Sequence, residues 1–181
     1  MRAGRLLSRT PIHRGRVLDL SLDRVVLPNG NEADLETIRH PGAAAVVPFV
    51  TEDEILLIRQ FRWATGGWIY EIPAGKLDKH PDPETCARRE LEEEVGRRAG
   101  RLESFGPIWT TPGFTDERIY LFAAYDLTPV PQALEADEVL TVVPMRWDRA
   151  LDLARRGELA DAKSLCAILH VVLRRMERAA I

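Results

Sequence analysis

The chain has 181 residues, which suits one domain with enough length to bury a core. Its formal net charge is -3 at pH 7, and basic and acidic residues alternate along the chain without a basic block, so a duplex nucleic-acid partner is not expected. No apolar run approaches the length of a membrane span, and the arginine-rich start lacks the apolar segment of a signal peptide. Cys86 and Cys166 form no C-x-x-C motif, so we expect reduced thiols and a cytoplasmic protein.

The first 40 residues indicate extended structure. Residues 16–27 alternate between polar and apolar types, which predicts a strand, and Pro28-Asn29-Gly30-Asn31 is a turn signal before a return strand near 35–39. We therefore expect a small N-terminal antiparallel sheet in residues 1–40, followed by a larger domain in residues 41–181.

The larger domain begins with two apolar strands. Residues 43–50 and 55–60 are predominantly apolar, with a polar turn at 51–54. Residues 68–72 predict a short strand that ends at Pro73-Ala74-Gly75. Further strands are predicted at 104–110, 118–125 and 139–145.

A helix is predicted between these strands by its end signals. Asp82 is a favourable N-cap, Pro83 suits the first helical position, and Gly96 suits the left-handed stop. Its buried stripe comprises Ala87, Leu91 and Val95. Two more helices are predicted near 148–156 and 161–178. Strands combined with late helices indicate an α+β fold with a mixed sheet between helices.

The predicted helix carries a cluster of carboxylates. Glu90 shares a face with Glu93 and Glu94, because residues three and four apart are neighbours on a helix. Like charges on one face repel, and a hard divalent cation relieves that repulsion. Mg²⁺ takes only one or two protein carboxylates and leaves room for water and phosphate oxygens. The segment therefore predicts a metal site that is open to a phosphate.

The spacing of this segment resembles the Nudix box, G-(five)-E-(seven)-R-E-U-x-E-E-x-G-U, where U is aliphatic. Two positions depart from it: Pro81 replaces the first glutamate and Arg97 the last aliphatic residue. The matching residues are Gly75, Arg89, Glu90, Leu91, Glu93, Glu94 and Gly96. The resemblance covers roughly residues 40 to 178. It implies a Nudix-type α/β/α sandwich in addition to the small N-terminal sheet.

The resemblance also implies an activity and its residues. Nudix enzymes hydrolyse nucleoside diphosphates linked to another group, using Mg²⁺ or Mn²⁺. By position, Glu90 and Glu94 match direct metal ligands, and Glu93 completes the cluster. The carbonyl of Ala74 matches a further ligand. Arg89 matches the residue that orients the glutamates through hydrogen-bonded pairing.

A catalytic base is expected on the loop before the strand at 139–145. In relatives that hydrolyse ADP-ribose, a glutamate on such a loop approaches the metals. Glu138 matches that position best, and Glu135 and Asp137 are the alternatives. The structural alternative is an ordinary acidic surface loop.

The position of Pro112 narrows the expected class of substrate. Fifteen residues separate it from Gly96, and a proline there resembles the marker of the ADP-sugar pyrophosphatase subfamily. Residues 59–62, 71–78 and 161–164 also resemble segments of ADP-ribose pyrophosphatases. This predicts cleavage of ADP-ribose or a related nucleoside diphosphate sugar into a nucleoside monophosphate and a sugar phosphate. The alternatives are a Nudix hydrolase for nucleoside triphosphates, capped RNA or dinucleoside polyphosphates, and a non-catalytic module that senses nucleotide sugars.

Two arginines match substrate contacts, because a guanidinium reads phosphate with two hydrogen bonds. Arg62 is the first candidate. Arg39, on the N-terminal return strand, is the second and belongs to the pocket of a neighbouring subunit if the N-terminal strands exchange. The resemblance implies a homodimer of that kind.

The sequence leaves open which residue stacks on the base of the substrate. Relatives often use an aromatic side chain from the N-terminal strands, where this chain has Val17 and Leu35. Trp63, Trp68 and Phe114 are the candidates to replace it, with burial in the core as the structural alternative for the tryptophans.

Overall fold

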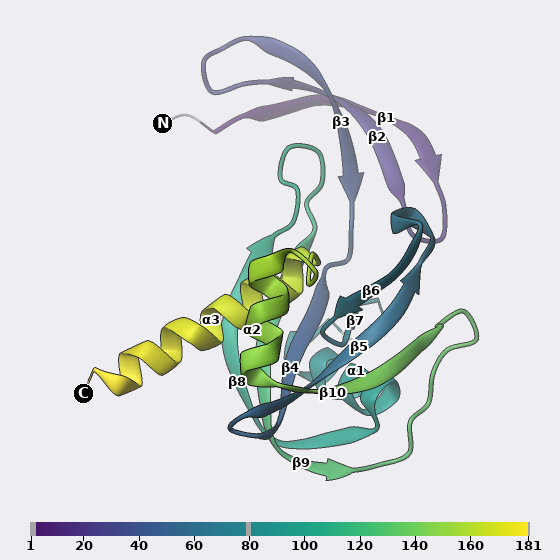
Figure 1. Ribbon diagram of the computed structural model, residues 1–181. Coiled ribbons are helices and arrows are strands. Elements are labelled where there is room, and N and C mark those ends of the chain that lie inside the picture. Colours follow the sequence, from purple (N-terminus) through teal and green to yellow (C-terminus); the bar gives the residue numbers. More distant parts are fainter. Residues whose placement is uncertain (1–2, 79–80, 181) are drawn as a thin grey trace. The chain divides into compact units, whose positions relative to one another are not determined.

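The computed structural model describes residues 3–78 and 81–180 and separates them into two compact units (Figure 1). One unit comprises the chain up to Gly42 together with Trp109–Arg118, and the other comprises Ala43–Ile108 and the chain from Ile119 onward. The segment Trp109–Arg118 thus joins the N-terminal unit, although it lies far along the sequence.

The N-terminal unit is built on a three-stranded antiparallel sheet in the order β1-β2-β3. Its strands are β1 (Arg5–Arg14), β2 (Asp19–Val26) and β3 (Glu32–Arg39). The expected turn lies between β2 and β3, where Leu27 N–H donates to the Asn31 carbonyl at 2.8 Å and Gly30 has a φ of 90°. The strand expected at 16–27 begins only at Asp19, because the preceding residues form the turn from β1.

The second unit contains a larger sheet with the path β10-β5-β4-β9-β8, while β6 pairs with β5 and β7 pairs with β4. β4 and β9 are parallel, whereas β5 is antiparallel to β4, β6 and β10. The sheet is therefore mixed, as expected. Its strands are β4 (Ala43–Thr51), β5 (Glu54–Arg62), β6 (Gly67–Glu71), β7 (Ala74–Lys76), β8 (Arg97–Trp109), β9 (Arg118–Pro129) and β10 (Leu140–Arg146).

Helices cover both faces of this sheet. They are α1 (Pro83–Val95), α2 (Trp147–Arg156) and α3 (Ala162–Ala179), with a short 3₁₀ turn, η1 (Trp63–Thr65), after β5. Side chains of β4 alternate between the two faces. Val46 packs in one core with Leu91 of α1, and Val47 packs in the other with Leu153 and Ile168 of α2 and α3. The unit is an α/β/α sandwich, which confirms the predicted fold.

One strand lies where a turn was expected. Pro73-Ala74-Gly75 was expected to end a strand, but Ala74–Lys76 forms β7 and pairs with Ala43–Ala45 of β4. Its partner lies about thirty residues earlier, so local turn signals could not indicate the pairing. This pairing holds the glycine of the box beside α1.

Candidate active site

Helix α1 begins and ends where its cap residues predict. The Asp82 carboxylate accepts a hydrogen bond from Thr85 N–H at 2.8 Å, and Gly96 closes the helix at a φ of 66° with its N–H on the Glu92 carbonyl. The buried face of α1 contains the expected apolar stripe and also Glu90 and Glu94. Two carboxylates are therefore turned towards the sheet.

Glu94 is the more deeply buried of the two, with 2% of its surface exposed. Its Oε2 accepts a hydrogen bond from Ala74 N–H at 2.9 Å. Burial, together with the nearby charge of Glu90, raises the pKa of Glu94 to about 8, although the Ala74 hydrogen bond acts in the opposite direction. The structure thus brings together Ala74, Glu90 and Glu94, which the sequence assigned to one site.

Gly75 is required by the position of Glu90. A Cβ added to Gly75 would lie 1.8 Å from Glu90 Oε1 and 2.1 Å from its carboxyl carbon. No other residue fits without moving the carboxylate. The first glycine of the box therefore serves as a cradle for the side chain of Glu90, fifteen residues later.

Arg89 lies between two carboxylates of the same helix. Its guanidinium is 2.6 Å from Glu90 and 2.8 Å from Glu93. It also donates to the Lys76 carbonyl at 3.4 Å, which links the helix to β7. Arg89 pairs with the glutamates in the manner expected of an orienting residue.

The donor set fits a divalent cation. Within residues 3–78 and 81–180, no three His, Cys, Asp or Glu side chains gather as a metal-binding group. Glu90 and Glu94 nevertheless supply two buried carboxylates whose charges disfavour each other, and Mg²⁺ needs no more than two from a protein. Both residues therefore suit a cation that is otherwise coordinated by water and phosphate oxygens.

The loop that carries Glu138 is attached to the end of α1. Gln132 Nε2 donates to the Glu94 carbonyl at 2.5 Å, and Ala133 N–H donates to the Glu93 carbonyl at 2.9 Å. The charge of Glu138 is among the causes that raise the pKa of Glu94. Glu138 itself accepts a hydrogen bond from Glu135 N–H at 2.7 Å. This contact holds the side chain of the predicted base.

Arg62 is held by a residue that sequence reasoning gave no role. Glu71 accepts two hydrogen bonds from Arg62, at 2.7 Å from Nε and 3.0 Å from Nη2, and it also accepts one from Lys163. Burial alone would raise the pKa of Glu71, but Arg62 and Lys163 outweigh it and the pKa lies below its ordinary value. Arg62 remains 42% exposed, so its guanidinium is fixed and still accessible.

Lys163 and Ser164 connect this network to α3. Lys163 is 3.0 Å from Asp161, which caps α3 by accepting from Ser164 N–H at 3.1 Å. Ser164 Oγ accepts a hydrogen bond from Ile72 N–H at 2.8 Å. The motif at 161–164 was noted in the sequence, but its contact with Glu71 spans 92 residues and left no local signal.

Three predicted substrate contacts belong to the N-terminal unit. Arg39 pairs with Asp23 at 2.9 Å and with Asp116 at 3.3 Å. Phe114 accepts a hydrogen bond from Ile38 N–H at 2.7 Å, and half of its surface is exposed. Pro112 lies exposed in the same loop. Asp116 thus links the return strand β3 to the loop that carries the proline marker.

The tryptophans proposed for base stacking are not core residues. Trp63 is 88% exposed and Trp68 is 46% exposed, so the alternative of burial is wrong for both. Trp68 packs against Phe61 at 5.9 Å and under Arg59 at 5.6 Å. Both rings remain accessible to a ligand.

Comparison with known proteins identifies the family of the chain. Residues 39–168 match the family model described as NUDIX domain, so the chain belongs to the Nudix family. Members of this family generally use a divalent metal ion.

Individual proteins similar to this chain include two enzymes or enzyme partners and one solved structure. The chain is 39% identical to an ADP-ribose pyrophosphatase of Bacillus subtilis (strain 168) over 93% of this chain and 92% of the relative. It is also 39% identical to a methanol dehydrogenase activator of Bacillus methanolicus, over 90% of this chain and 89% of the relative. A solved structure titled "Crystal structure of ADP compounds hydrolase" superposes with a TM-score of 0.86 and 21% identity, covering 100% of this chain and 98% of the other. At that identity the superposition supports the fold.

Proposed function

We propose that the chain hydrolyses the pyrophosphate bond of ADP-ribose or a related nucleoside diphosphate sugar, with Mg²⁺ or Mn²⁺ as cofactor. The products are a nucleoside monophosphate and a sugar phosphate. The observation that carries the proposal is the pair Glu90 and Glu94, buried side by side above Gly75. Relatives named ADP-ribose pyrophosphatase and, at 36% identity, GDP-mannose pyrophosphatase of Cronobacter sakazakii support the substrate class.

The residues divide the chemistry between them. When bound, a divalent cation supplies positive charge to the diphosphate oxygens and lowers the pKa of water. Glu90, Glu94 and the Ala74 carbonyl hold it, and Glu93 joins them directly or through water. Arg89 fixes Glu90 and Glu93, while Arg62, clamped by Glu71, presents its exposed guanidinium to a phosphate.

Glu138 is the proposed general base. A base must lie within hydrogen-bonding reach of the attacking water, directly or through one further water. The charge of Glu138 contributes to the raised pKa of Glu94, which supports a position of its carboxylate near the proposed metal ligands. Glu135 and Asp137 are the alternatives on the same loop.

The N-terminal unit is the proposed dimerisation and substrate-binding region. Every residue of β1 is exposed, and exposed apolar side chains that gather on one surface are typical of an interaction site. Exposed apolar residues of this sheet include Leu6, Ile12 and Leu22. A homodimer that pairs these surfaces would cover them and bring Arg39, Pro112 and Phe114 to the substrate.

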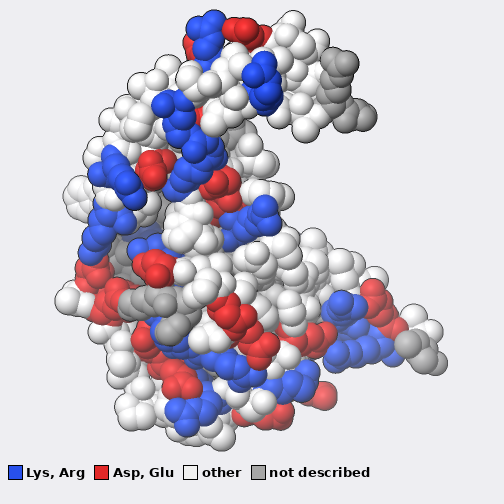
Figure 2. Space-filling view, turned by 180° about the vertical axis from the view of Figure 1, so that it is seen from behind, with Lys and Arg blue, Asp and Glu red and all other residues white. Residues whose placement is uncertain are grey.

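We propose a cytoplasmic location and no duplex nucleic-acid partner. Cys86 and Cys166 are free thiols, which suits a reducing compartment. No helix in the described part of the chain has the length and apolar character to cross a membrane. Basic and acidic side chains are interspersed over the face in Figure 2, unlike the continuous basic surface that duplex binding requires.

A hydrolysis panel tests the proposal. Purified protein with saturating Mg²⁺ is incubated with ADP-ribose, GDP-mannose, dGTP and diadenosine polyphosphate, and products are identified by mass. We expect the highest kcat/KM for a nucleoside diphosphate sugar. Higher activity on dGTP or the polyphosphate would identify another Nudix substrate.

The relative named methanol dehydrogenase activator favours a second candidate, in which the chain acts on a dehydrogenase. Turnover of an alcohol dehydrogenase is then measured with and without the chain. Binding of ADP-ribose without hydrolysis would instead favour a sensing module.

A further inference from the structure

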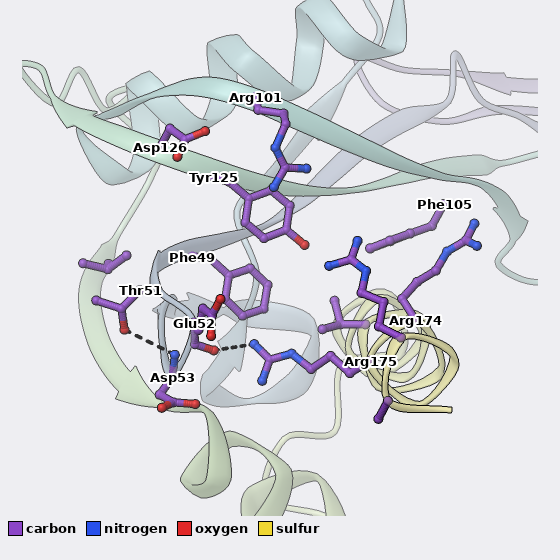
Figure 3. A pocket seen from close by; sticks show the side chains of 14 residues that line it. Phe49, Thr51, Glu52, Asp53, Arg101, Phe105, Tyr125, Asp126, Arg174 and Arg175 are labelled. Atoms are coloured by element: carbon purple, nitrogen blue, oxygen red, sulfur yellow. Dashed lines mark hydrogen bonds between the residues drawn. The ribbon is translucent and has the colours of Figure 1, made fainter. Parts of the chain in front are cut away.

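A cavity lies at the opposite end of β5 from Arg62. It has a volume of about 580 Å³, within the range of small-molecule sites. The turn between β4 and β5 lines it together with β8, β9 and the last turns of α3 (Figure 3). Nine strand residues at roughly 3.3 Å each place it about 30 Å from Arg62. The cavity is therefore separate from the candidate active site.

Guanidinium groups form one wall of this cavity. They belong to Arg101 of β8 and to Arg174, Arg175 and Arg178 of α3. Figure 2 shows basic side chains gathered towards the C-terminal end of α3. Two of the four are fixed on aromatic rings. Arg101 lies 3.9 Å above Tyr125, and Arg175 lies 4.7 Å from Trp147 and donates to the Glu52 carbonyl.

Three arginines of this wall share one carboxylate partner. Glu103 is 3.3 Å from Arg178, 3.8 Å from Arg101 and 3.9 Å from Arg174. Close guanidinium–carboxylate pairs are about 2.7–2.9 Å apart, so none of the three is tightly bound to Glu103. Arg174 is also 3.3 Å from Glu177 of the same helix, which is again longer than a close pair. The guanidinium groups of this wall therefore keep N–H donors that are not engaged in close pairs and can bind an anion.

The other surfaces of the cavity are aromatic and acidic. Phe49 and Tyr125 stack at 5.3 Å, and Phe105 adds a third ring. Glu52 and Asp126 also line the cavity and supply acceptors. A simple anion would leave these surfaces without a role. A ligand with a phosphate, a planar ring and hydroxyl or amino donors matches all three kinds of surface.

We propose that this cavity is a second binding site, for a nucleoside monophosphate. The phosphate lies against Arg174 and Arg178, the base contacts the ring of Phe105, and the acidic side chains accept from the nucleoside donors. Guanidinium groups suit phosphate, and aromatic faces suit any base. The proposal does not depend on the reaction at the candidate active site.

Calorimetric titration of the metal-free, full-length protein in EDTA tests this site. The probes are AMP, ribose 5-phosphate and adenosine, which separate the contributions of phosphate and ring. We expect AMP to bind most tightly. The double variant Arg174→Ala/Arg178→Ala should weaken AMP binding at least tenfold, whereas Arg155→Ala/Arg156→Ala on the exposed end of α2 should leave it unchanged. Equal affinity of AMP and ribose 5-phosphate would refute the role of the ring.

Glu94→Gln separates this site from the candidate active site. AMP binding that persists in Glu94→Gln and is lost in the double arginine variant supports the cavity. Binding lost in Glu94→Gln but retained in the double variant overturns the proposal, as does the absence of saturable AMP binding. Circular dichroism checks the fold, and Phe105→Ala gives an independent variant that should weaken AMP but not ribose 5-phosphate.

Discussion

The charged side chains near one end of β5 are buried, whereas those near the other end are exposed. Near the end of β5 at Arg62, the side chains of Glu71, Glu94 and Lys163 are each at most 10% exposed. Where β5 begins, Arg174 and Arg178 have more than half of their side chains exposed. Withdrawing a charge from water costs several kcal/mol unless it is paired, whereas exposed charges cost little. The comparison therefore indicates large mutational effects at the first end and small ones at the second.

Glu94→Gln should have the largest effect. It removes a proposed ligand charge and keeps the shape, so kcat should fall by roughly 10³-fold, equivalent to about 4 kcal/mol of barrier. Because burial raises the pKa of Glu94 to about 8, the neutral amide should not lower the melting temperature of the metal-free protein. Steady-state kinetics and thermal unfolding measure the two effects. Retained activity would refute the ligand assignment.

Lys163→Met should be the most destabilising change. It leaves the buried carboxylate of Glu71 with only Arg62, and breaking a buried pair costs roughly 3–5 kcal/mol. Urea unfolding measures the loss. Arg146→Ala, which breaks an exposed pair with Asp148, is the control and should change stability by less than about 0.5 kcal/mol.

The loss in Lys163→Met should depend on pH. The pKa of Glu71 is lowered in the wild type, so its contribution is present above the unfolded pKa of about 4.3 and is lost as pH falls through the lower folded value. Removing Lys163 raises that pKa. The stability difference between the proteins should therefore shrink below about pH 4. A difference independent of pH would show that Lys163 acts through packing alone.

Glu138→Gln tests the general base. Loss of a positioned base costs roughly 10²-fold or more in kcat, with little change in KM. Glu135→Gln is the matched control from the same loop. If the control alone loses activity, the assignment within the loop is shifted.

Gly75→Ala should have an intermediate effect. The added Cβ meets Glu90 Oε1 at 1.8 Å, so the carboxylate must move away from its place beside Glu94. We expect about tenfold weaker activation by Mg²⁺, measured as the metal concentration for half-maximal rate. Gly67→Ala, where a Cβ meets nothing within 4 Å, should activate like the wild type.

Arg178→Ala should have the smallest effect on stability, because Arg178 lies among the exposed charges near the start of β5. Its guanidinium is 3.3 Å from Glu103, and 64% of the Arg178 side chain is exposed. The free energy of unfolding should change by less than about 0.5 kcal/mol. A loss above 2 kcal/mol would show that the charges at this end are structural, and the contrast between the two ends would disappear.

Local signals predicted the box helix and the order of strands. The cap residues Asp82 and Gly96 set the ends of α1, and apolar runs set β4 and β5, because these depend on neighbours in sequence. The shared face of Glu90, Glu93 and Glu94 followed from helical spacing. The pairing of Glu71 with Lys163 did not, because the two residues are 92 positions apart and nothing near either one indicates the other.

Charged, irregular segments were also hard to predict. β1 is exposed along its whole length and has no alternating pattern, so its sequence indicated only an extended chain. β7 was taken for a turn, since Pro-Ala-Gly normally ends a strand. The contacts between Trp109–Arg118 and β3 include the pair of Arg39 with Asp116, which are 77 residues apart in the sequence.

The close approach of Gly75 and Glu90 couples two positions that are distant in sequence. A side chain at position 75 is tolerated only if position 90 shortens or withdraws at the same time. A substitution at position 75 alone therefore meets a barrier that a paired exchange would avoid. Engineering of this loop must treat the two positions as one unit of variation.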